Sequence, residues 1–151
     1  MTNTTPYSEE LVKKFKEDYA LTAEDFWQLK VGKKQLWIIK HNALERVATA
    51  EGIDWKLECL SFAPDVVVKC TAYKAERYVE SFGEATPNNS SNKFPYAMAE
   101  KRAVDRCILK LLDAHAYIYS DEEADDFKKQ HKENVDNEEA TDLINSAPRV
   151  E

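Results

Sequence analysis

Three basic residues spaced four apart are the strongest sign of binding chemistry in this sequence. Arg102, Arg106 and Lys110 lie in one helix-like stretch. Residues four apart stack above one another on a helix, so the three side chains would form one cationic row. Guanidinium groups match phosphate oxygens in geometry and charge, and such a row can bind a nucleic-acid backbone. A solvated helix face without a ligand explains the same spacing, so both interpretations stay open here.

The polar loop TPNNSSNKFP before this stretch supports the binding interpretation. Small polar side chains and free N–H groups near a helix N-terminus are good phosphate partners. Lys33 and Lys34 add positive charge in a predicted turn, and an aromatic ring at the loop–helix junction could stack on a base. The predicted nucleic-acid-binding residues are Arg102, Arg106, Lys110, Lys93, Lys33, Lys34 and Tyr96.

Other chemistries find little support. With 3 glycines there is no Gly-rich phosphate loop, and the histidines at 41, 115 and 131 lack metal-ligand spacing. The three widely spaced cysteines, at 59, 70 and 107, read as buried, inert thiols. Four carboxylates could be imagined as the metal ligands of a nuclease: Glu80, Glu84, Glu100 and Asp105. Nothing in their surroundings makes this the preferred interpretation, so we expect no catalytic residue, no metal and no cofactor.

Acidity is concentrated at the C-terminal end. Residues 121–151 carry 11 acidic and 4 basic side chains, which accounts for the whole net charge of -7. We therefore predict an α+β domain over residues 1–120, followed over 121–151 by an acidic helix with Ser120 as N-cap and, after about residue 133, a disordered tail. The chain has neither an apolar run that could span a membrane nor a signal-like apolar core, so a cytoplasmic location is expected.

Helical periodicity predicts three flanking or central helices. Residues 8–18 have apolar side chains on one side, and a second helix runs from a capping pattern at Asn42 to Gly52. Between them, Thr22 and Asp25 form another capping pattern, residues 31–34 read as a turn, and LWII reads as a short strand. The clearest helix covers residues 96–114, with Pro95 in its first turn.

A period of two between these helices predicts strands. IDWKLECLSF alternates as a half-buried strand with Trp55, Leu57 and Cys59 on its buried side. VVVKCTAYKA and ERYVESFGEAT follow as two more strands after short turns, and residues 116–119 could form another. The predicted fold is an α+β domain in which an antiparallel three- to four-stranded meander packs against the long helix.

This order of elements resembles a known family. A helix ending in ALERVATAEGI, the three strands and the helix YAMAEKRAVDRCILKLLDA are similar to the single-strand annealing recombination proteins of the phage Erf and Sak groups, in the Rad fifty-two-like superfamily. The matching helix residues are Ala99, Lys101, Ala103, Asp105, Arg106 and Leu109, and Phe82-Gly83-Glu84 resembles a glycine turn of the family. The resemblance covers about residues 40–115, and Leu112-Asp113-Ala114 stands where the family has Phe-Gly.

The resemblance implies a function and partners. It implies a non-enzymatic phage or mobile-element protein that binds single-stranded DNA between helix and sheet and anneals complementary strands. It also implies a homo-oligomeric ring or filament, and a single-strand-binding protein or an exonuclease could be a further partner. The alternatives are a nucleic-acid or protein interaction module with an acidic docking tail, a structural phage protein, and a nuclease.

Overall fold

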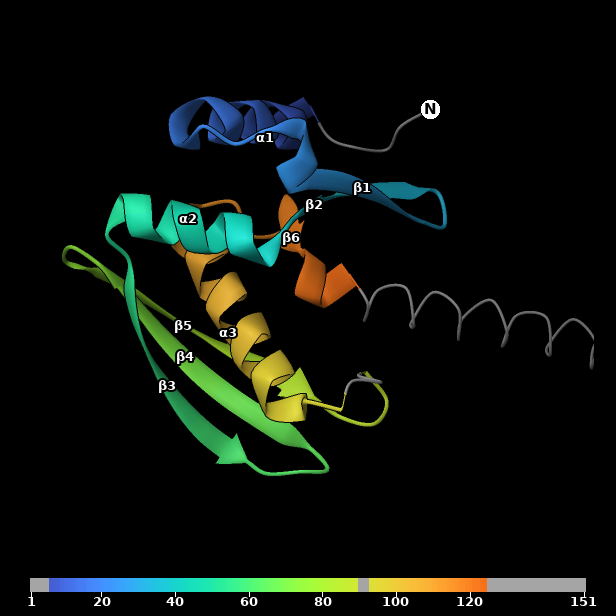
Figure 1. Cartoon of the computed structure of the whole chain (residues 1–151), viewed down its shortest axis with the longest axis vertical. Coiled ribbons are helices and arrows are strands. Elements are labelled where there is room, and N and C mark those ends of the chain that lie inside the picture. The colour runs from blue at the N-terminus through green and yellow to red at the C-terminus, as the bar shows by residue number, and fades with distance from the viewer. Residues whose placement is uncertain (1–5, 90–92, 125–151) are drawn as a thin grey trace, which may run out of the picture.

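The computed structural model describes residues 6–89 and 93–124. The chain forms two small sheets connected through helices, and the predicted α+β class is confirmed (Figure 1). The elements are α1 (Pro6–Tyr19), the 3-10 turn η1 (Ala23–Asp25), β1 (Phe26–Val31), β2 (Lys34–Ile39), α2 (His41–Glu51), β3 (Asp54–Ser61), β4 (Val66–Lys74), β5 (Arg77–Ala85), α3 (Pro95–Leu111) and β6 (Ile118–Ser120).

The predicted meander is the larger feature of the fold. β3, β4 and β5 pair antiparallel in sequence order, and α3 crosses the face of β4 and β5 (Figure 1). Alternate residues of β4 are buried under the helix, from Val66 to Ala72. The buried face of α3 includes Ala103, Cys107 and Ile108, as the apolar periodicity predicts.

Gly83 lets α3 approach β5 closely. A Cβ atom at this position would lie 1.9 Å from the carbonyl oxygen of Ala99 and 2.5 Å from the backbone nitrogen of Ala103. Only a residue without a side chain fits there. The comparison of Phe82-Gly83-Glu84 with a turn is therefore wrong, because Gly83 lies inside β5 and serves helix–sheet packing.

The second sheet has the order β1-β2-β6. β1 and β2 form a hairpin, and β6 adds in parallel to β2, so the antiparallel expectation holds for the meander and not for every pair. The Thr22–Asp25 capping box forms, but it closes a single 3-10 turn before β1. Asn42 is not the cap of α2, since the helix begins at His41 after Lys40, whereas Gly52 ends it in the left-handed conformation at φ 67°.

The face of β3 differs from the prediction. Trp55, Leu57 and Cys59 do share the α3 side of the sheet with the buried residues of β4, but every residue from Asp54 to Leu60 is exposed. The reason is that α3 covers β4 and β5 and leaves β3 uncovered (Figure 1). Cys59 is therefore an exposed thiol, while the cysteines at 70 and 107 are buried as expected.

Residues 121–124 continue as a helix after β6. The remainder of the predicted acidic helix and the predicted disordered tail lie outside the described residues. Within the described ranges, none of the helices has the length and apolar character needed to cross a bilayer.

Candidate nucleic-acid interface

The three cations of α3 bind the backbone of β5. Arg102 donates to the carbonyl oxygen of Glu84 at 2.7 Å, Arg106 donates to that of Phe82, and Lys110 donates to that of Glu80 at 3.4 Å. Three side chains spaced four apart on the helix thus bind three carbonyls spaced two apart on the strand. We call Arg102, Arg106 and Lys110 the cationic row of α3.

The two spacings match for a geometric reason. Four residues of α-helix advance about 6 Å, and two residues of strand advance about 6.8 Å. α3 runs antiparallel to β5, so each step along the helix reaches the next carbonyl of the same side of the strand. The helical spacing therefore has a structural explanation, because edge carbonyls need hydrogen-bond donors.

Arg102 is buried rather than solvent-facing, with 2% of its surface exposed. Besides Glu84, its guanidinium donates to the carbonyl oxygens of Asn89 and Glu122, both at 3.0 Å. The expectation that Arg102 lies on an exposed polar face is thus wrong, since the loop after β5 and the segment after β6 enclose it. In this conformation it fixes those segments and has no open path to a phosphate.

Acidic residues after β6 lie against the same helix. The Glu123 carboxylate accepts from Arg106 Nε, and Glu122 forms an ion pair with Lys101 at 3.8 Å. We call Asp121–Glu123 the acidic clasp. It begins at Asp121, whose carboxylate accepts a hydrogen bond from the His41 backbone nitrogen at 2.8 Å. The start of the acidic region therefore neutralises part of the positive charge of α3.

An open groove lies between β5, α3 and β6. It has a volume of about 450 Å³. Two cations of the row line it together with His115 and two aromatic rings; the full lining is Ser81, Phe82, Glu84, Arg106, Lys110, His115, Tyr119 and Glu123. Burial and the neighbouring Lys110 lower the pKa of His115, so its imidazole is neutral at pH 7. Arg106 and Lys110 are then balanced by two glutamates.

The other predicted binding residues lie elsewhere. Lys33 and Lys34 are exposed at the β1–β2 turn, which projects away from α3 (Figure 1). Lys93 is exposed just before α3, and the Tyr96 hydroxyl accepts a hydrogen bond from the Ala63 nitrogen at 3.2 Å. The seven predicted residues therefore do not form one continuous surface, and only Arg106 and Lys110 line the groove.

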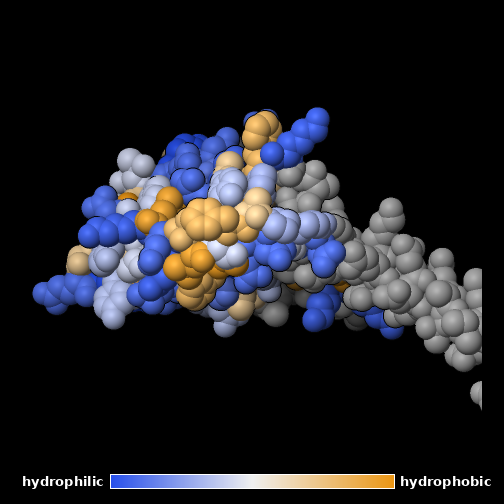
Figure 2. All heavy atoms as spheres, turned by 90° about the horizontal axis from the view of Figure 1, so that it is seen from below, coloured by the Kyte–Doolittle hydropathy of each residue, from blue (hydrophilic) through white to orange (hydrophobic). Residues whose placement is uncertain are grey.

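Apolar surface gathers at the end of the molecule where α3 begins. Figure 2 shows this face, with apolar side chains grouped between polar ones. The exposed hydrophobic residues of the β3–β4 connection and of the start of α3 are Leu60, Phe62, Phe94 and Tyr96. Phe94 and Tyr96 flank Pro95 at the junction of loop and helix and both are exposed, and the hydrogen bond from Ala63 to Tyr96 joins the two segments.

A half-buried histidine between two carboxylates lies on the other flank of α3. His41 Nδ1 is 2.6 Å from Asp105 Oδ1, and His41 Nε2 is 2.9 Å from Glu45 Oε1. Asp105 is fully buried and its Oδ2 lacks a hydrogen-bond partner within the described ranges. The Ser120 hydroxyl lies close enough to lower the pKa of Asp105 but does not complete a hydrogen bond to it.

His41, Asp105 and Glu45 form a triad, and the charges of its members follow from their surroundings. The hydrogen bond to Asp105 raises the pKa of His41 to about 9. Burial raises the pKa of Asp105 to about 6, although His41 opposes that rise. At pH 7 the pair is thus an imidazolium and a carboxylate that fasten α2 to α3. A histidine already protonated at pH 7 is a poor general base.

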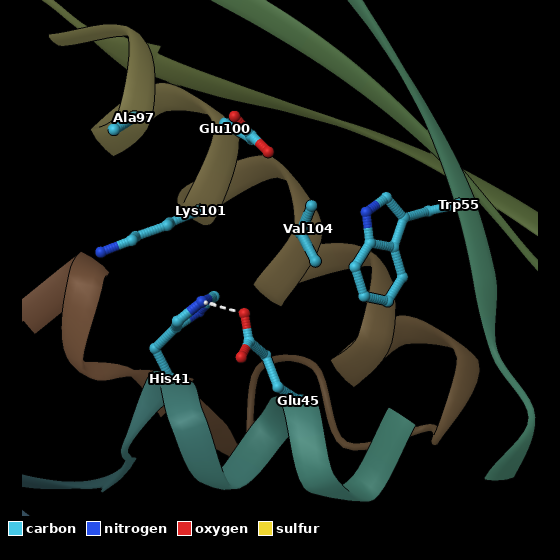
Figure 3. A pocket seen from close by; sticks show the side chains of 7 residues that line it. All are labelled: His41, Glu45, Trp55, Ala97, Glu100, Lys101 and Val104. Atoms are coloured by element: carbon cyan, nitrogen blue, oxygen red, sulfur yellow. Dashed lines mark hydrogen bonds and ion pairs between the residues drawn. The ribbon is translucent and has the colours of Figure 1, made fainter. Parts of the chain in front are cut away.

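A small pocket of about 150 Å³ opens beside His41 and Glu45 (Figure 3). Trp55 of β3 and Val104 of α3 form its apolar side, while Glu100 and Lys101 line it from the helix. The described residues contain no cluster of three or more side chains arranged to hold a metal ion. The pocket therefore offers mixed charge beside one indole ring.

Sequence reasoning missed the partners of its best residues. Lys101 and Asp105 are four apart in α3, a spacing at which an ion pair can form, but Asp105 is buried against His41 and Lys101 contacts Glu122. The spacing of His41 and Glu45, four apart in α2, signals that they are neighbours. No sequence pattern signals that Asp105 completes the triad. Comparison of the chain with family models, curated proteins and solved structures finds no match.

Proposed function

We propose that this protein binds a single nucleic-acid strand in the groove between β5, α3 and β6, and that it anneals complementary DNA strands. The observation that carries the proposal is the convergence of two cations with two aromatic rings in one open groove. Arg106 and Lys110 come from α3, Phe82 from β5, and Tyr119 from β6. Phosphates and stacked bases are the two chemistries that such a groove recognises.

The site is smaller than the seven residues suggested by the sequence. Among the described residues, Lys110 is the cation of the groove that forms no ion pair with a carboxylate, and it keeps only a long contact of 3.4 Å to the carbonyl oxygen of Glu80. Arg106 is neutralised by Glu123. A strand that enters the groove would compete with the acidic clasp for Arg106, so binding and movement of the clasp would be linked.

Annealing is the activity that the resemblance implies, and it needs neither metal nor nucleotide. A groove that holds the phosphate backbone leaves base edges available for pairing, and two bound strands meet at a raised local concentration. The proposal is therefore non-enzymatic, with single-stranded DNA as the ligand.

Anisotropy of a fluorescent oligothymidylate, titrated at several salt concentrations, tests the binding step. The variant Lys110→Gln/His115→Gln should weaken binding, and it should flatten the salt dependence by about one unit, because Lys110 carries a positive charge and the His115 imidazole is neutral at pH 7. The control Lys13→Gln/Lys14→Gln changes exposed residues of α1 and should leave affinity nearly unchanged. Equal losses in both variants, or no binding by the wild type, would refute the groove as the site.

Annealing is tested separately. Two complementary labelled strands are mixed with the protein in EDTA, and duplex formation is followed by energy transfer. Faster pairing with the wild type than with the Lys110→Gln/His115→Gln variant is expected. Binding without faster pairing would support an interaction module and reject annealing.

A further inference from the structure

β3 is an open edge strand. It spans eight residues, contains no proline and, in the part of the chain that the structure describes, pairs with β4 alone. Its residues from Asp54 to Leu60 are exposed, including Trp55 at 36% and Leu57 at 40%. An exposed, unpaired edge of this length is a ready template for another strand, and proteins usually protect such edges.

Hydrogen-bond alternation shows which groups of β3 point outward. The carbonyl oxygens of Phe82 and Glu80 accept hydrogen bonds from α3 at the β5 edge. The backbone C=O and N–H groups of these two residues therefore point away from β4. Lys69 and Thr71 lie opposite these residues in β4, so their backbone hydrogen bonds must run in the other direction, toward β3. β4 thus exchanges its hydrogen bonds with one set of alternate residues in β3.

That set is known from the register. Lys69 lies opposite Glu58, and Thr71 lies opposite Lys56. The backbone groups of Lys56 and Glu58 are therefore used by β4, and those of the intervening Leu57 point outward. The backbone groups of Trp55 and Cys59, two residues to either side of Leu57, point outward in the same way.

We propose that a second copy of this chain pairs with the open edge, as an antiparallel β3–β3 contact centred on Leu57. In that register Leu57 hydrogen-bonds to Leu57 of the partner subunit, using outward groups on both sides. Lys56 then lies opposite Glu58 of the partner subunit, and Glu58 opposite Lys56 of the partner subunit. The edge is thus self-complementary in charge as well as in hydrogen bonding, which a two-fold interface requires.

The opposite edge of the sheet explains why the assembly stops at two copies. A ring or filament would need β3 of one copy to pair with β5 of the next. The carbonyls of β5 are already bound by the cationic row of α3. Pairing of β3 with β3 uses the open edge of the β3-β4-β5 sheet in both copies at once, so the result is a closed dimer in which the two sheets form one of six strands.

The pairing also covers apolar surface. Trp55, Leu57 and Cys59 share the α3 side of the sheet and are exposed there, because α3 lies mainly over β4 and β5. In the dimer, Trp55 lies opposite Cys59 of the partner subunit, and the two Leu57 side chains meet at the two-fold axis. The inference is independent of the proposed function, because it uses neither the groove nor its ligand.

Sedimentation equilibrium of the full chain under reducing conditions tests the proposal. The wild type should have twice the 17.4 kDa chain mass. Lys56→Glu places two like-charge pairs across the axis and should shift the equilibrium to monomer by about tenfold or more in dissociation constant. The double reversal Lys56→Glu/Glu58→Lys restores both opposite-charge pairs and should restore the dimer.

Controls separate loss of pairing from loss of folding. Lys13→Glu makes the same charge change on exposed α1 and should remain dimeric. Melting curves at low concentration should show Lys56→Glu folded, since this side chain is exposed. A monomeric wild type, a larger assembly, an unaffected Lys56→Glu variant, or a folded double reversal that stays monomeric would each overturn the proposal.

Discussion

The two edges of the β3-β4-β5 sheet are treated in opposite ways. β5 has its outward carbonyls bound by the cationic row of α3, while β3 has exposed side chains along nearly its whole length. The same helix causes both results, because it lies over β5 and β4 and leaves β3 uncovered. An arginine row that resembles a ligand site from the sequence can therefore be the protection of a sheet edge, and the unprotected edge marks where pairing can occur.

The largest expected effect concerns the close approach that brings α3 onto β5. Gly83→Ala would place a Cβ atom against the backbone of Ala99 and Ala103, where no flexible side chain can yield. We expect a loss of about 3 kcal/mol in the free energy of unfolding, measured by urea denaturation. Gly52→Ala is the control, because its left-handed backbone is unfavourable for alanine but no atom lies within 4 Å of the new Cβ.

That control should cost about 1 kcal/mol. Equal losses in the two variants would mean that backbone conformation, and not helix–strand contact, dominates at Gly83. The protection of the β5 edge by a tightly packed helix would then be unsupported.

Arg102 gives the next largest effect. Arg102→Met keeps much of the apolar stem but removes donors to Glu84, Asn89 and Glu122. Leaving buried carbonyls without donors should cost about 2 kcal/mol or more. The cost is expected because Arg102 is buried; an exposed arginine could be replaced with little effect on folding.

Arg46→Met is the matched control. Arg46 pairs with Asp25 at the surface with 55% of its side chain exposed, and such pairs contribute about 1 kcal/mol or less. Both variants are compared by thermal and urea unfolding. A cost at Arg102 no larger than at Arg46 would contradict a structural role for the first cation of the row.

Much of the architecture was predictable because it depends on local patterns. The period of two over residues 53–83 predicts the meander, which is confirmed; the apolar stripe predicts a helix over 96–114, and α3 forms over Pro95–Leu111. What the sequence could not show is which strands the helix covers. Trp55 and Leu57 alternate as core residues do, yet a helix centred over β4 and β5 leaves them exposed.

The candidate site was harder to predict for a related reason. Spacing shows that Arg106 and Lys110 share a helix face, but it does not show whether phosphates or protein carbonyls meet that face. The answer depends on β5 and on residues 122–123, which are distant in sequence. The contact between His41 of α2 and Asp105 of α3 likewise joins two helices, and no local sequence pattern signals that they meet.

The ion pair between His41 and Asp105 predicts that the stability of the protein depends on pH. The folded pKa of His41, about 9, lies above its usual value of 6.5. Folding therefore favours the protonated ring, so its contribution is fully present below pH 6.5 and is lost as pH rises through about 9. Its loss should lower the free energy of unfolding on the order of 3 kcal/mol across this window.

Urea denaturation at a series of pH values measures this effect. Asp105 does not interfere, because its pKa is raised from 3.8 only to about 6 and its change lies below the window. His41→Gln should give a flatter profile between pH 6.5 and 9. A wild-type profile that is already flat there would show that the imidazolium does not stabilise the contact between α2 and α3.

The smallest expected effect concerns whether Arg106, which binds the β5 edge, can also bind a ligand. Glu123→Gln removes the carboxylate that neutralises Arg106 at the groove, while the amide keeps nearly the same shape. If the groove binds a strand through Arg106, the variant should bind oligothymidylate a few-fold more tightly and with a steeper salt dependence, since one more cation is available for phosphate.

Glu24→Gln on η1 removes the same charge from an exposed position and should change affinity little. Anisotropy at one low and one moderate salt concentration distinguishes the two variants. An unchanged affinity in Glu123→Gln would mean that Arg106 serves β5 alone, and that the cationic row contributes to the sheet edge and not to the ligand.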